Sequence, residues 1–492
     1  MYRNKSRFVV NLPMLLRVAG WLMLIEALFM LIPIATCLYY GEPDWLPFSL
    51  TAAATALTGL LLSRQIRPTY HSMGKRDGFL LTAMVWIVFS IFGMIPFMFC
   101  HHQLSVSNAF FEAMSGFTTT GASVLTDVTH MSHGVHIWRA TMQWLGGMGI
   151  ILFTIAVIPM LNSSGGMLMF NAEVTGITHD KLRPRISETA KALWLIYIAL
   201  TIVLVLLLWA GPMTLFDSVC HAFGAISTGG YSTYNEGIAI FGSVYVKVVL
   251  TVFMFIGGVN FSLIYRTLRG EWNALRHNDV FRTYILVILA MYALFVAGIL
   301  LQGKWEGWQD LTINPVFQII STITSTGFTP TNFENWGPFV LALVMVLMLF
   351  GACAGSTSGG AKIDRLLFLI KNCRNEIYRC IYPHAIMSVR VNGRVVSADI
   401  VNKVIAFLCI YMLLIVAGGI IICAMGVPII DAFFSAFSCM SNTGLGAGIT
   451  GFGGSYDMLP DAAKWVLSAL MLTGRLEIFT VLLMFTPSFW RK

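Results

Sequence analysis

The chain has 492 residues, of which 57% are hydrophobic and 11% are charged, and its formal net charge is +8. Soluble globular proteins carry about 25% charged residues, so this composition excludes an ordinary soluble protein and predicts an integral membrane protein. The nine cysteines occur without any CxxC pair, so neither a disulfide framework nor a zinc site is indicated.

The chain opens with two apolar stretches, near residues 14–40 and 46–62, behind a basic start that contains Arg3, Lys5 and Arg7. Each stretch is long enough to cross a hydrocarbon core. The first is too long for the apolar region of a signal peptide and has no small-x-small cleavage site, so we expect it to be retained. Residues 1–72 are therefore predicted to form an N-terminal extension of two helices.

Further apolar stretches bring the expected number of spanning helices to about ten, and they lie near 78–100, 137–161, 192–216, 239–264, 284–301, 336–355, 400–425 and 463–487. They divide the chain into four units of similar build: 73–163, 164–268, 269–372 and 373–492. In each unit we expect an outer helix, a short re-entrant helix, a polar turn and an inner helix. Non-helical backbone at membrane depth is tolerated only where it is buried or lines a wet cavity, so four such turns imply one shared axis. The predicted fold class is an all-α polytopic membrane protein with four pseudo-symmetric repeats around a central pore.

One short signature marks the polar turn of every unit. Its four copies, roughly a hundred residues apart, are Thr119-Thr120-Gly121, Ser227-Thr228-Gly229, Ser325-Thr326-Gly327 and Asn442-Thr443-Gly444. An apolar segment of about a dozen residues precedes each copy, and these segments open on Asn108, Asp217, Asn314 and Asp431, residue types that suit a helix N-cap. Recurrence in matching context indicates an internal repeat.

The chemistry of the turns suits a cation. A bare cation leaves water only where oxygen dipoles replace its hydration shell, and rings of backbone carbonyls do this for potassium. Glycine permits the backbone conformations that such a ring needs, and the preceding threonines add carbonyl or hydroxyl oxygens. No acidic residue occupies the four triplets, whereas divalent ions favour carboxylates. We interpret the triplets as the selectivity filter of one pore for a monovalent cation.

Two features below the turns are candidates for a gate. The run from Gly351 to Lys362, which contains Gly355, Gly359 and Gly360, interrupts an otherwise long helix. Each glycine costs a helix about 1 kcal/mol relative to alanine, so the run is either a cytoplasmic linker or a flexible loop under the pore. Arg475 lies inside the last apolar stretch, where a charge costs roughly 2.5 to 3.5 kcal/mol. It is predicted either to pair with a carboxylate or to face the pore beneath the filter.

The positive-inside rule assigns sides to the loops. With a cytoplasmic N-terminus, most of the 31 lysines and arginines fall inside, and the C-terminus is cytoplasmic too. Outside lie only Arg139, Lys247, Lys304 and Lys464, so the outer face is net negative. Such a field concentrates cations at a pore mouth, although the insertion rule alone could also explain the asymmetry.

The cytoplasmic segments contain no Gly-x-Gly-x-x-Gly and no P-loop, so nucleotide binding is not encoded in this chain. Residues 387–396 surround an Asn-Gly pair, which predicts a β-hairpin. The hairpin is expected either to dock a soluble partner or to contact acidic membrane lipids, together with the basic residues Lys371, Arg374, Arg379 and the loop 181–185.

These motifs together resemble the Trk/Ktr/HKT superfamily of potassium-uptake proteins and, within it, the TrkH branch. The resemblance rests on the four turns, the stretch 181–194, the loop 351–365 and the ending 474–491. It implies K⁺ as the transported ion, a filter lined by Gly121, Gly229, Gly327 and Gly444, an intramembrane gating loop formed by the glycine-rich run, and Arg475 at the constriction. It also implies a multi-pass homodimer in the bacterial inner membrane and a cytoplasmic TrkA-like nucleotide-binding regulatory subunit, with no organic cofactor and no nucleic-acid partner.

Two other functional classes share some of these features, a coupled transporter and a membrane enzyme. A proton- or sodium-coupled secondary cation symporter would also carry glycine-rich broken helices, but fourfold rather than twofold repetition argues against it. A membrane enzyme is disfavoured because the scattered histidines show no ligand spacing; among them are His101, His102, His130, His133 and His136. We therefore expect no enzymatic activity, while the choice between channel-like and coupled transport is left open.

Overall fold

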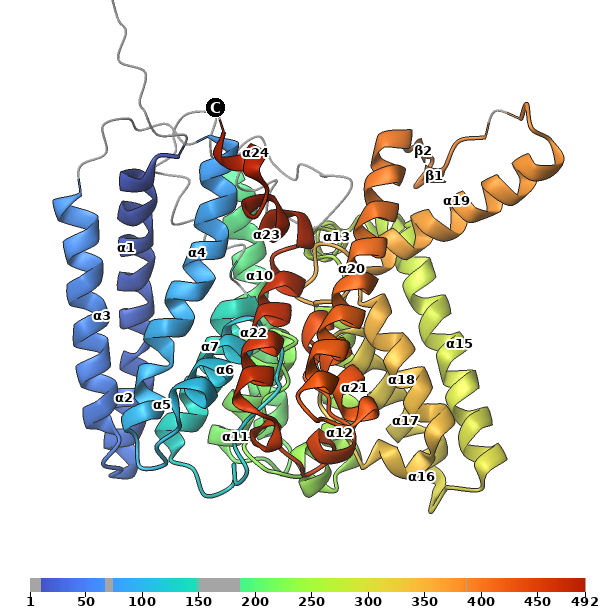
Figure 1. Cartoon of the computed structure of the whole chain (residues 1–492). Helices are drawn as coiled ribbons and strands as arrows, with labels where there is room; N and C mark the ends of the chain where they lie inside the picture. Colours follow the sequence, from blue (N-terminus) through green and yellow to red (C-terminus); the bar gives the residue numbers. More distant parts are fainter. Residues whose placement is uncertain (1–9, 67–73, 148, 150–185, 386, 492) are drawn as a thin grey trace, which may run out of the picture.

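The structure, a computed structural model, describes residues 10–66, 74–147, 149, 186–385 and 387–491. The N-terminal extension lies at one edge of the molecule (Figure 1). It consists of α1 (Leu12–Phe29), α2 (Leu31–Tyr40) and α3 (Trp45–Gln65), and α1 packs along α3. The helices α1 and α2 follow one another as a single apolar segment of 29 residues, so the predicted two-span extension is confirmed.

Four units of outer, pore and inner helix follow the extension, which confirms the predicted fold class. The outer helices are α4 (Lys75–Gly93) with α5 (Ile95–Phe99), α10 (Ile186–Trp209), α15 (Asp279–Gln302) and α20 (Ala398–Ala424). The pore helices are α6 (Val106–Phe117), α11 (Leu215–Ile226), α17 (Ile313–Ile323) and α21 (Ile429–Ser441). The inner helices are α7 (His133–Gly147), α12 (Val244–Gly257), α18 (Pro338–Phe350) and α22 (Asp461–Arg475). The exact domain and repeat boundaries stay predictions, and those between 72 and 73 and between 163 and 164 lie outside the described residues.

The remaining helices and turns lie between these helices or follow the last of them. They are α13 (Phe261–Leu268), α14 (Trp272–Arg276), α16 (Trp308–Leu311), α19 (Ile363–Ile381), α23 (Ile478–Met484), α24 (Pro487–Trp490), and the 3₁₀ turns η2 (Gly237–Phe241), η3 (Phe333–Trp336), η4 (Gly448–Thr450) and η5 (Tyr456–Met458). Among them α19 is the longest and runs outward from the body of the protein (Figure 1).

The predicted spans 239–264 and 463–487 are broken helices in the structure, and the predicted span 137–161 lies largely outside the described residues. In the described residues, six helical segments are long and apolar enough to cross a membrane. The second, third and fourth inner helices end after 13 to 15 residues, and the residues that follow Gly147 in the first lie largely outside the described part of the chain. Two of them continue after a sharp bend, of 102° between α12 and α13 and of 116° between α22 and α23. Hydropathy could not show these breaks because the apolar sequence continues through them.

The starts of the pore helices also need a correction. Ser105 caps α6 by accepting the Asn108 N–H at 3.3 Å, and Thr214 caps α11 by accepting the Asp217 N–H at 3.1 Å. The four residues predicted as caps therefore lie in the first turn. In that position their side chains can bind a neighbouring repeat. Asn108 of the first repeat, for example, accepts a hydrogen bond from the Lys464 ammonium of the fourth repeat at 2.6 Å.

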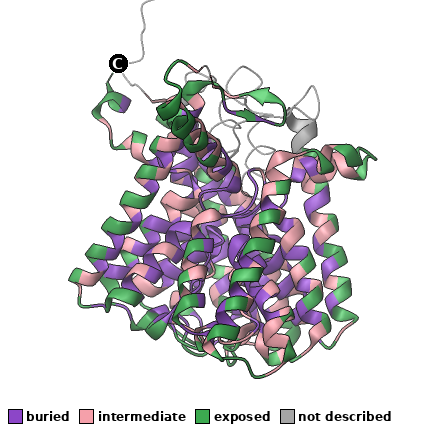
Figure 2. Ribbon diagram, turned by 90° about the vertical axis from the view of Figure 1, so that its right-hand side faces the viewer, coloured by how far each residue is buried: buried purple, intermediate pink, exposed green. Residues whose placement is uncertain are grey.

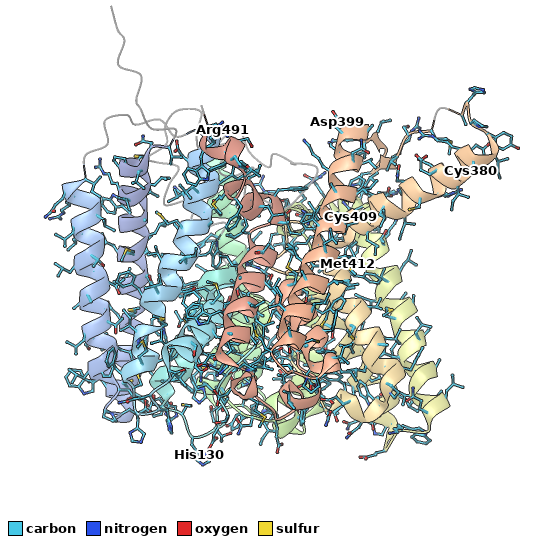
Figure 3. All side chains as sticks on the ribbon, in the orientation of Figure 1. His130, Cys380, Asp399, Cys409, Met412 and Arg491 are labelled. Carbon is cyan, nitrogen blue, oxygen red and sulfur yellow. The ribbon has the colours of Figure 1, made fainter. Side chains whose placement is uncertain are left out.

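Buried residues gather in the interior of the molecule and exposed residues lie along its outside (Figure 2), and the pore helices α6, α11, α17 and α21 are largely buried. The molecule has two opposite ends, with His130 at one and Asp399 and Arg491 at the other (Figure 3). We call the first end the vestibule face. The second is the hairpin face, because it carries β1 (Arg390–Val391) and β2 (Arg394–Val395), which confirm the predicted hairpin.

Candidate ion pore and gate

The same backbone turn follows all four pore helices. Its first residue is not glycine and yet has a left-handed φ: 53° at Thr119, 55° at Thr228, 54° at Ser325 and 54° at Asn442. Two residues later stands a glycine with φ of 85° at Gly121, 76° at Gly230, 81° at Gly327 and 75° at Gly444. A left-handed φ is uncommon for residues other than glycine, so its recurrence at the same place shows that the turns are equivalent.

Hydrogen bonds confirm this alignment. The middle residue of each turn donates its N–H to the carbonyl five residues earlier, in the pairs Thr120–Ser115 at 2.9 Å, Gly229–Gly224 at 2.8 Å, Thr326–Ser321 at 2.8 Å and Thr443–Ser438 at 2.9 Å. The second turn is therefore Thr228-Gly229-Gly230, one residue later than predicted. The sequence offered two registers there because two glycines follow two hydroxyl residues, and the backbone selects the register that places Gly230 at the left-handed position.

The four turns interlock into one ring. A Cβ atom on the glycine of one turn would collide with the middle carbonyl oxygen of the next turn, in the pairs Gly121–Gly229, Gly230–Thr326, Gly327–Thr443 and Gly444–Thr120. The contacts run in one direction and return to the first turn. Glycine is required at these positions both for its φ and for this close approach. The same four glycines line a cavity on the vestibule side of the ring, together with Ser123 and Tyr231.

In three turns the middle residue is a threonine whose hydroxyl is tied to the same pore helix. Its Oγ1 lies 2.8 Å from a hydroxyl oxygen two residues earlier, in the pairs Thr120–Thr118, Thr326–Thr324 and Thr443–Ser441. The second turn has Gly229 at this position. There the side chain of Gln143, from α7, contacts the turn instead. The sequence gave no sign of this residue, because nothing in a helical glutamine marks it as a partner of a turn 86 residues away.

A buried ion pair supports the turns of the first two repeats. Arg139 Nε donates to Glu112 at 2.7 Å, and the side chains are only 3% and 0% exposed. Glu112 also accepts the Val124 N–H at 2.9 Å, while the Arg139 guanidinium lies 4.0 Å from the centre of the Tyr231 ring. A buried carboxylate and guanidinium are stable only when they are paired and hydrogen-bonded, so these contacts hold the backbone behind the ring.

Most of the cations that the sequence predicted on the outer face are buried, which their positions in the sequence did not indicate. Of the four cations predicted on the outer face, three are buried: Arg139, Lys247 and Lys464. Lys247 donates to the Asn314 amide oxygen at 2.8 Å, which joins the second inner helix to the third pore helix. These cations therefore act mainly as links between repeats and not as free surface charges.

The glycine-rich run from Gly351 to Lys362 lies directly beneath the turns. Thr357 Oγ1 donates to the carbonyl of Ile226, which precedes the second turn, at 3.1 Å. The Gly359 N–H donates to Ser325 Oγ in the third turn at 2.6 Å. All but Gly355 in the run are buried, and Lys362 Nζ donates back to the Ser358 carbonyl. Of the two predicted readings, the cytoplasmic linker is wrong.

Arg475 connects this run to the first and fourth repeats. Its Nη1 donates to the Thr357 carbonyl at 2.8 Å, and its Nη2 donates to the Gly146 carbonyl at 2.9 Å. Just beyond it, Glu477 pairs with Arg365, whose guanidinium also lies 3.8 Å from the centre of the Phe407 ring. A positively charged group and a buried loop therefore lie on the hairpin side of the ring and contact all four repeats.

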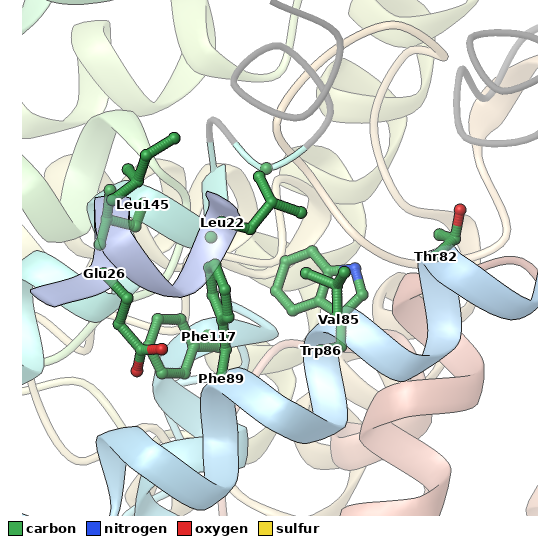
Figure 4. A pocket seen from close by; sticks show the side chains of 11 residues that line it. Leu22, Glu26, Thr82, Val85, Trp86, Phe89, Phe117 and Leu145 are labelled. Carbon is green, nitrogen blue, oxygen red and sulfur yellow. The ribbon is translucent and has the colours of Figure 1, made fainter. Parts of the chain in front are cut away.

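A second cavity lies beside the first pore helix, away from the ring. Its wall is apolar and comes from α1, α4, α6 and α7, including Phe117 and Leu145 (Figure 4). Glu26 is the acidic residue in this wall; within the described part of the chain its oxygens have no hydrogen-bond partner. None of the turn residues lines this cavity, but its lining includes Gly146, whose carbonyl accepts a hydrogen bond from Arg475.

Comparison with known proteins gives consistent matches over nearly the whole chain. Residues 48–282 and 309–492 match the family TrkH, described as cation transport protein. The chain is similar to the Trk system potassium uptake protein TrkH of Escherichia coli strain K12, with 35% identity over 480 residues that cover 97% of this chain and 99% of that one. It is 31% identical to the Trk system potassium uptake protein TrkG of the same strain, over 96% of this chain and 97% of that one. The crystal structure of the potassium transporter TrkH from Vibrio parahaemolyticus superimposes with a TM-score of 0.88 at 32% identity and covers 98% of this chain and 100% of that one.

Proposed function

The chain belongs to the TrkH family of cation transport proteins, and from this premise we propose that it takes up potassium selectively through the ring of four turns. The resemblance inferred from the sequence motifs is thereby confirmed, as is a multi-pass membrane protein. The observation that carries the proposal is the closed ring, in which the glycine of each turn lies against the middle carbonyl of the next.

The composition of the ring favours a monovalent cation. Its carbonyl dipoles can replace the hydration shell of potassium, whereas none of the turn residues carries a carboxylate. In the first, third and fourth turns the threonine hydroxyls are bonded to their own pore helices, which leaves the backbone carbonyls as the principal ligands. The ion-binding set in this proposal is Thr119, Thr120, Gly121, Thr228, Gly229, Gly230, Ser325, Thr326, Gly327, Asn442, Thr443 and Gly444.

The run from Gly351 to Lys362 and the guanidinium of Arg475 form the gate in this proposal. A fixed positive charge below the carbonyl ring opposes a cation that leaves it, and the loop fills the space beneath two of the turns. Opening requires Thr357 to give up its hydroxyl bonds to the Ile226 and Gly257 carbonyls and the bond that its own carbonyl accepts from Arg475. These are a few individual hydrogen bonds, each worth about 1 kcal/mol net, so a modest input of free energy can shift the loop.

The hairpin face is the cytoplasmic face in this proposal, since the exposed Arg390 and Arg394 lie there. The hairpin is fixed to the third repeat, because Asp279 at the start of α15 accepts hydrogen bonds from Lys371 and from the Asn392 N–H, both at 3.0 Å. A TrkA-like nucleotide-binding subunit docked there could therefore act on α19, the helix that follows the run from Gly351 to Lys362. The loop 181–185, predicted to share this surface, lies outside the described residues. A homodimer in the bacterial inner membrane, in contact with membrane lipids, completes the proposal.

A coupled symporter is the second candidate. It is favoured by the sharp bends between α12 and α13 and between α22 and α23, since discontinuous helices are typical of ion-coupled transporters. Both candidates transport potassium, and they differ in whether a second ion must move with it.

Flux measurements on purified protein in liposomes test the proposal. Potassium, sodium and proton gradients are set independently, and the initial rate of cation uptake is followed. We expect potassium uptake down its own gradient with no second ion present and little uptake of sodium. Uptake that requires a proton or sodium gradient would establish the symporter, and equal uptake of potassium and sodium would refute the selective filter.

A further inference from the structure

The second wall of the ring differs from the other three, and the difference involves a side chain from outside the turns. Where the first, third and fourth turns have a threonine, the second has Gly229. The space beside it is occupied by the side chain of Gln143, since a Cβ added to Gly229 would lie only 2.5 Å from Gln143 Cδ and 2.8 Å from its Cγ. A threonine could not fit there without displacing the glutamine.

Gln143 makes two hydrogen bonds that bracket the left-handed glycine of this turn. Its Nε2 donates to the Gly229 carbonyl at 2.6 Å, and its Oε1 accepts the Tyr231 N–H at 3.1 Å. Only one orientation of the side-chain amide satisfies both partners, because one is an acceptor and the other a donor. Gly230, with φ of 76°, lies between them.

These bonds affect the carbonyl that belongs to the ring. The Gly229 oxygen lies against Gly121 of the first turn, and it is the counterpart of the Thr120, Thr326 and Thr443 oxygens. A hydrogen bond from an amide fixes the direction of this carbonyl and withdraws part of its electron density from any ion. Gln143 is itself 0% exposed, so no bulk water competes for either bond.

We propose that Gln143 is a positioning residue for ion selectivity, which sets the direction and ligand strength of the Gly229 carbonyl and makes the filter chemically asymmetric. The proposal rests on potassium uptake through the ring. On this view the first, third and fourth turns contribute the carbonyl of a threonine, and the second turn contributes the Gly229 carbonyl, which is held by α7. Since α7 belongs to the first repeat, the residue also ties the first two walls to each other.

The test replaces Gln143 by Leu, which keeps most of the volume and removes both bonds, and by Met as a second, more adaptable variant. Gln318→Leu is the matched control, because Gln318 is equally buried, yet its amide nitrogen bonds only to Thr322 within α17. The potassium-to-sodium uptake ratio is measured in liposomes for each variant, next to wild type and Gly121→Ser. We expect the ratio to fall about tenfold, the factor that corresponds to 1.4 kcal/mol, in a Gln143 variant that folds, and to stay unchanged in the control.

A second arm tests the steric part of the proposal. Gly229→Thr alone should lower the ratio because the threonine displaces Gln143. Gly229→Thr combined with Gln143→Ala should recover part of the ratio, since the second turn then has a threonine at its middle position like the other three turns. Suppose that the wild type is selective for potassium and Gly121→Ser loses this selectivity, but neither Gln143 variant changes the potassium-to-sodium uptake ratio. This result would overturn the role of Gln143 and leave the proposed function intact. A wild type without potassium selectivity would instead contradict the proposed function itself.

Discussion

The four turns and the run beneath them are both rich in glycine, but they are held in place by different kinds of contact. Each turn repeats the same backbone hydrogen bond, between 2.8 and 2.9 Å long, and each glycine abuts the carbonyl of the next turn. The run from Gly351 to Lys362 begins with backbone hydrogen bonds to the second repeat, from the Cys353 N–H to Gly258 and from the Phe261 N–H to Gly355. Its stretch from Ser356 to Gly360 is held to other segments by single side chains such as Thr357 and Arg475, with no repeated pattern. The difference indicates that the ring has one geometry set by its backbone, whereas the stretch from Ser356 to Gly360 can leave its place when a few side-chain hydrogen bonds break.

The largest effect is expected behind the ring. Glu112→Gln leaves the Arg139 guanidinium buried without its charge partner, which should lower the free energy of unfolding by about 3–5 kcal/mol. Thermal or denaturant unfolding in detergent measures the loss. Glu376→Gln is the control, because its ion pair with Arg379 is exposed, with side chains 52% and 40% accessible, and such pairs contribute about 0–1 kcal/mol. Equal losses in the two variants would show that the pair does not support the turns.

The next effect concerns the ring glycines. Gly444→Ser puts a side chain against the Thr120 carbonyl at a φ of 75°, so the potassium-to-sodium uptake ratio should fall by at least about tenfold. Gly41→Ser is the matched control, since its φ is 71° and nothing lies within 4 Å of an added Cβ. Backbone strain is similar in both, so a loss of selectivity in both would mean that strain, and not the ring contact, is responsible.

Below the ring, Arg475→Ala should raise the initial rate of potassium uptake by about tenfold, because it removes the positive charge and the bond that holds Thr357. Arg475→Lys keeps the charge but reaches the two carbonyls less well, so its rate should lie between those of wild type and Arg475→Ala. A folded Arg475→Ala protein with unchanged or abolished uptake would contradict the gate.

The smallest effect is expected on the hairpin face. Arg390→Glu with Arg394→Glu should weaken binding of the proposed nucleotide-binding subunit by roughly threefold and leave uptake by the chain alone unchanged, because both residues are exposed and belong to the rim of the proposed docking surface. Arg64→Glu, an exposed arginine at the end of α3 in the N-terminal extension, is the control. Surface plasmon resonance measures the binding. An equal loss of affinity in Arg64→Glu would show that net charge, and not a docking site, is responsible.

The sequence was most informative where the repeats resemble one another. Recurrence of the turns predicted four units around one axis, and the Asn392-Gly393 pair predicted the hairpin. It was least informative where packing decides between local alternatives. The register of the second turn depends on which of Gly229 and Gly230 takes a left-handed φ, and only the contacts with the neighbouring turns settle it. The pairing of Glu112 with Arg139 and the approach of Gln143 to Gly229 join segments that no local pattern connects.

In the proposed mechanism, potassium binds at the ring formed by the middle carbonyls of the four turns. Crystals grown with rubidium or thallium in place of potassium test it directly through anomalous scattering. We predict an anomalous peak on the axis of the ring, between the carbonyl oxygens of Thr120, Gly229, Thr326 and Thr443. Peaks found only elsewhere, with the ring well ordered and free of anomalous density, would contradict the account.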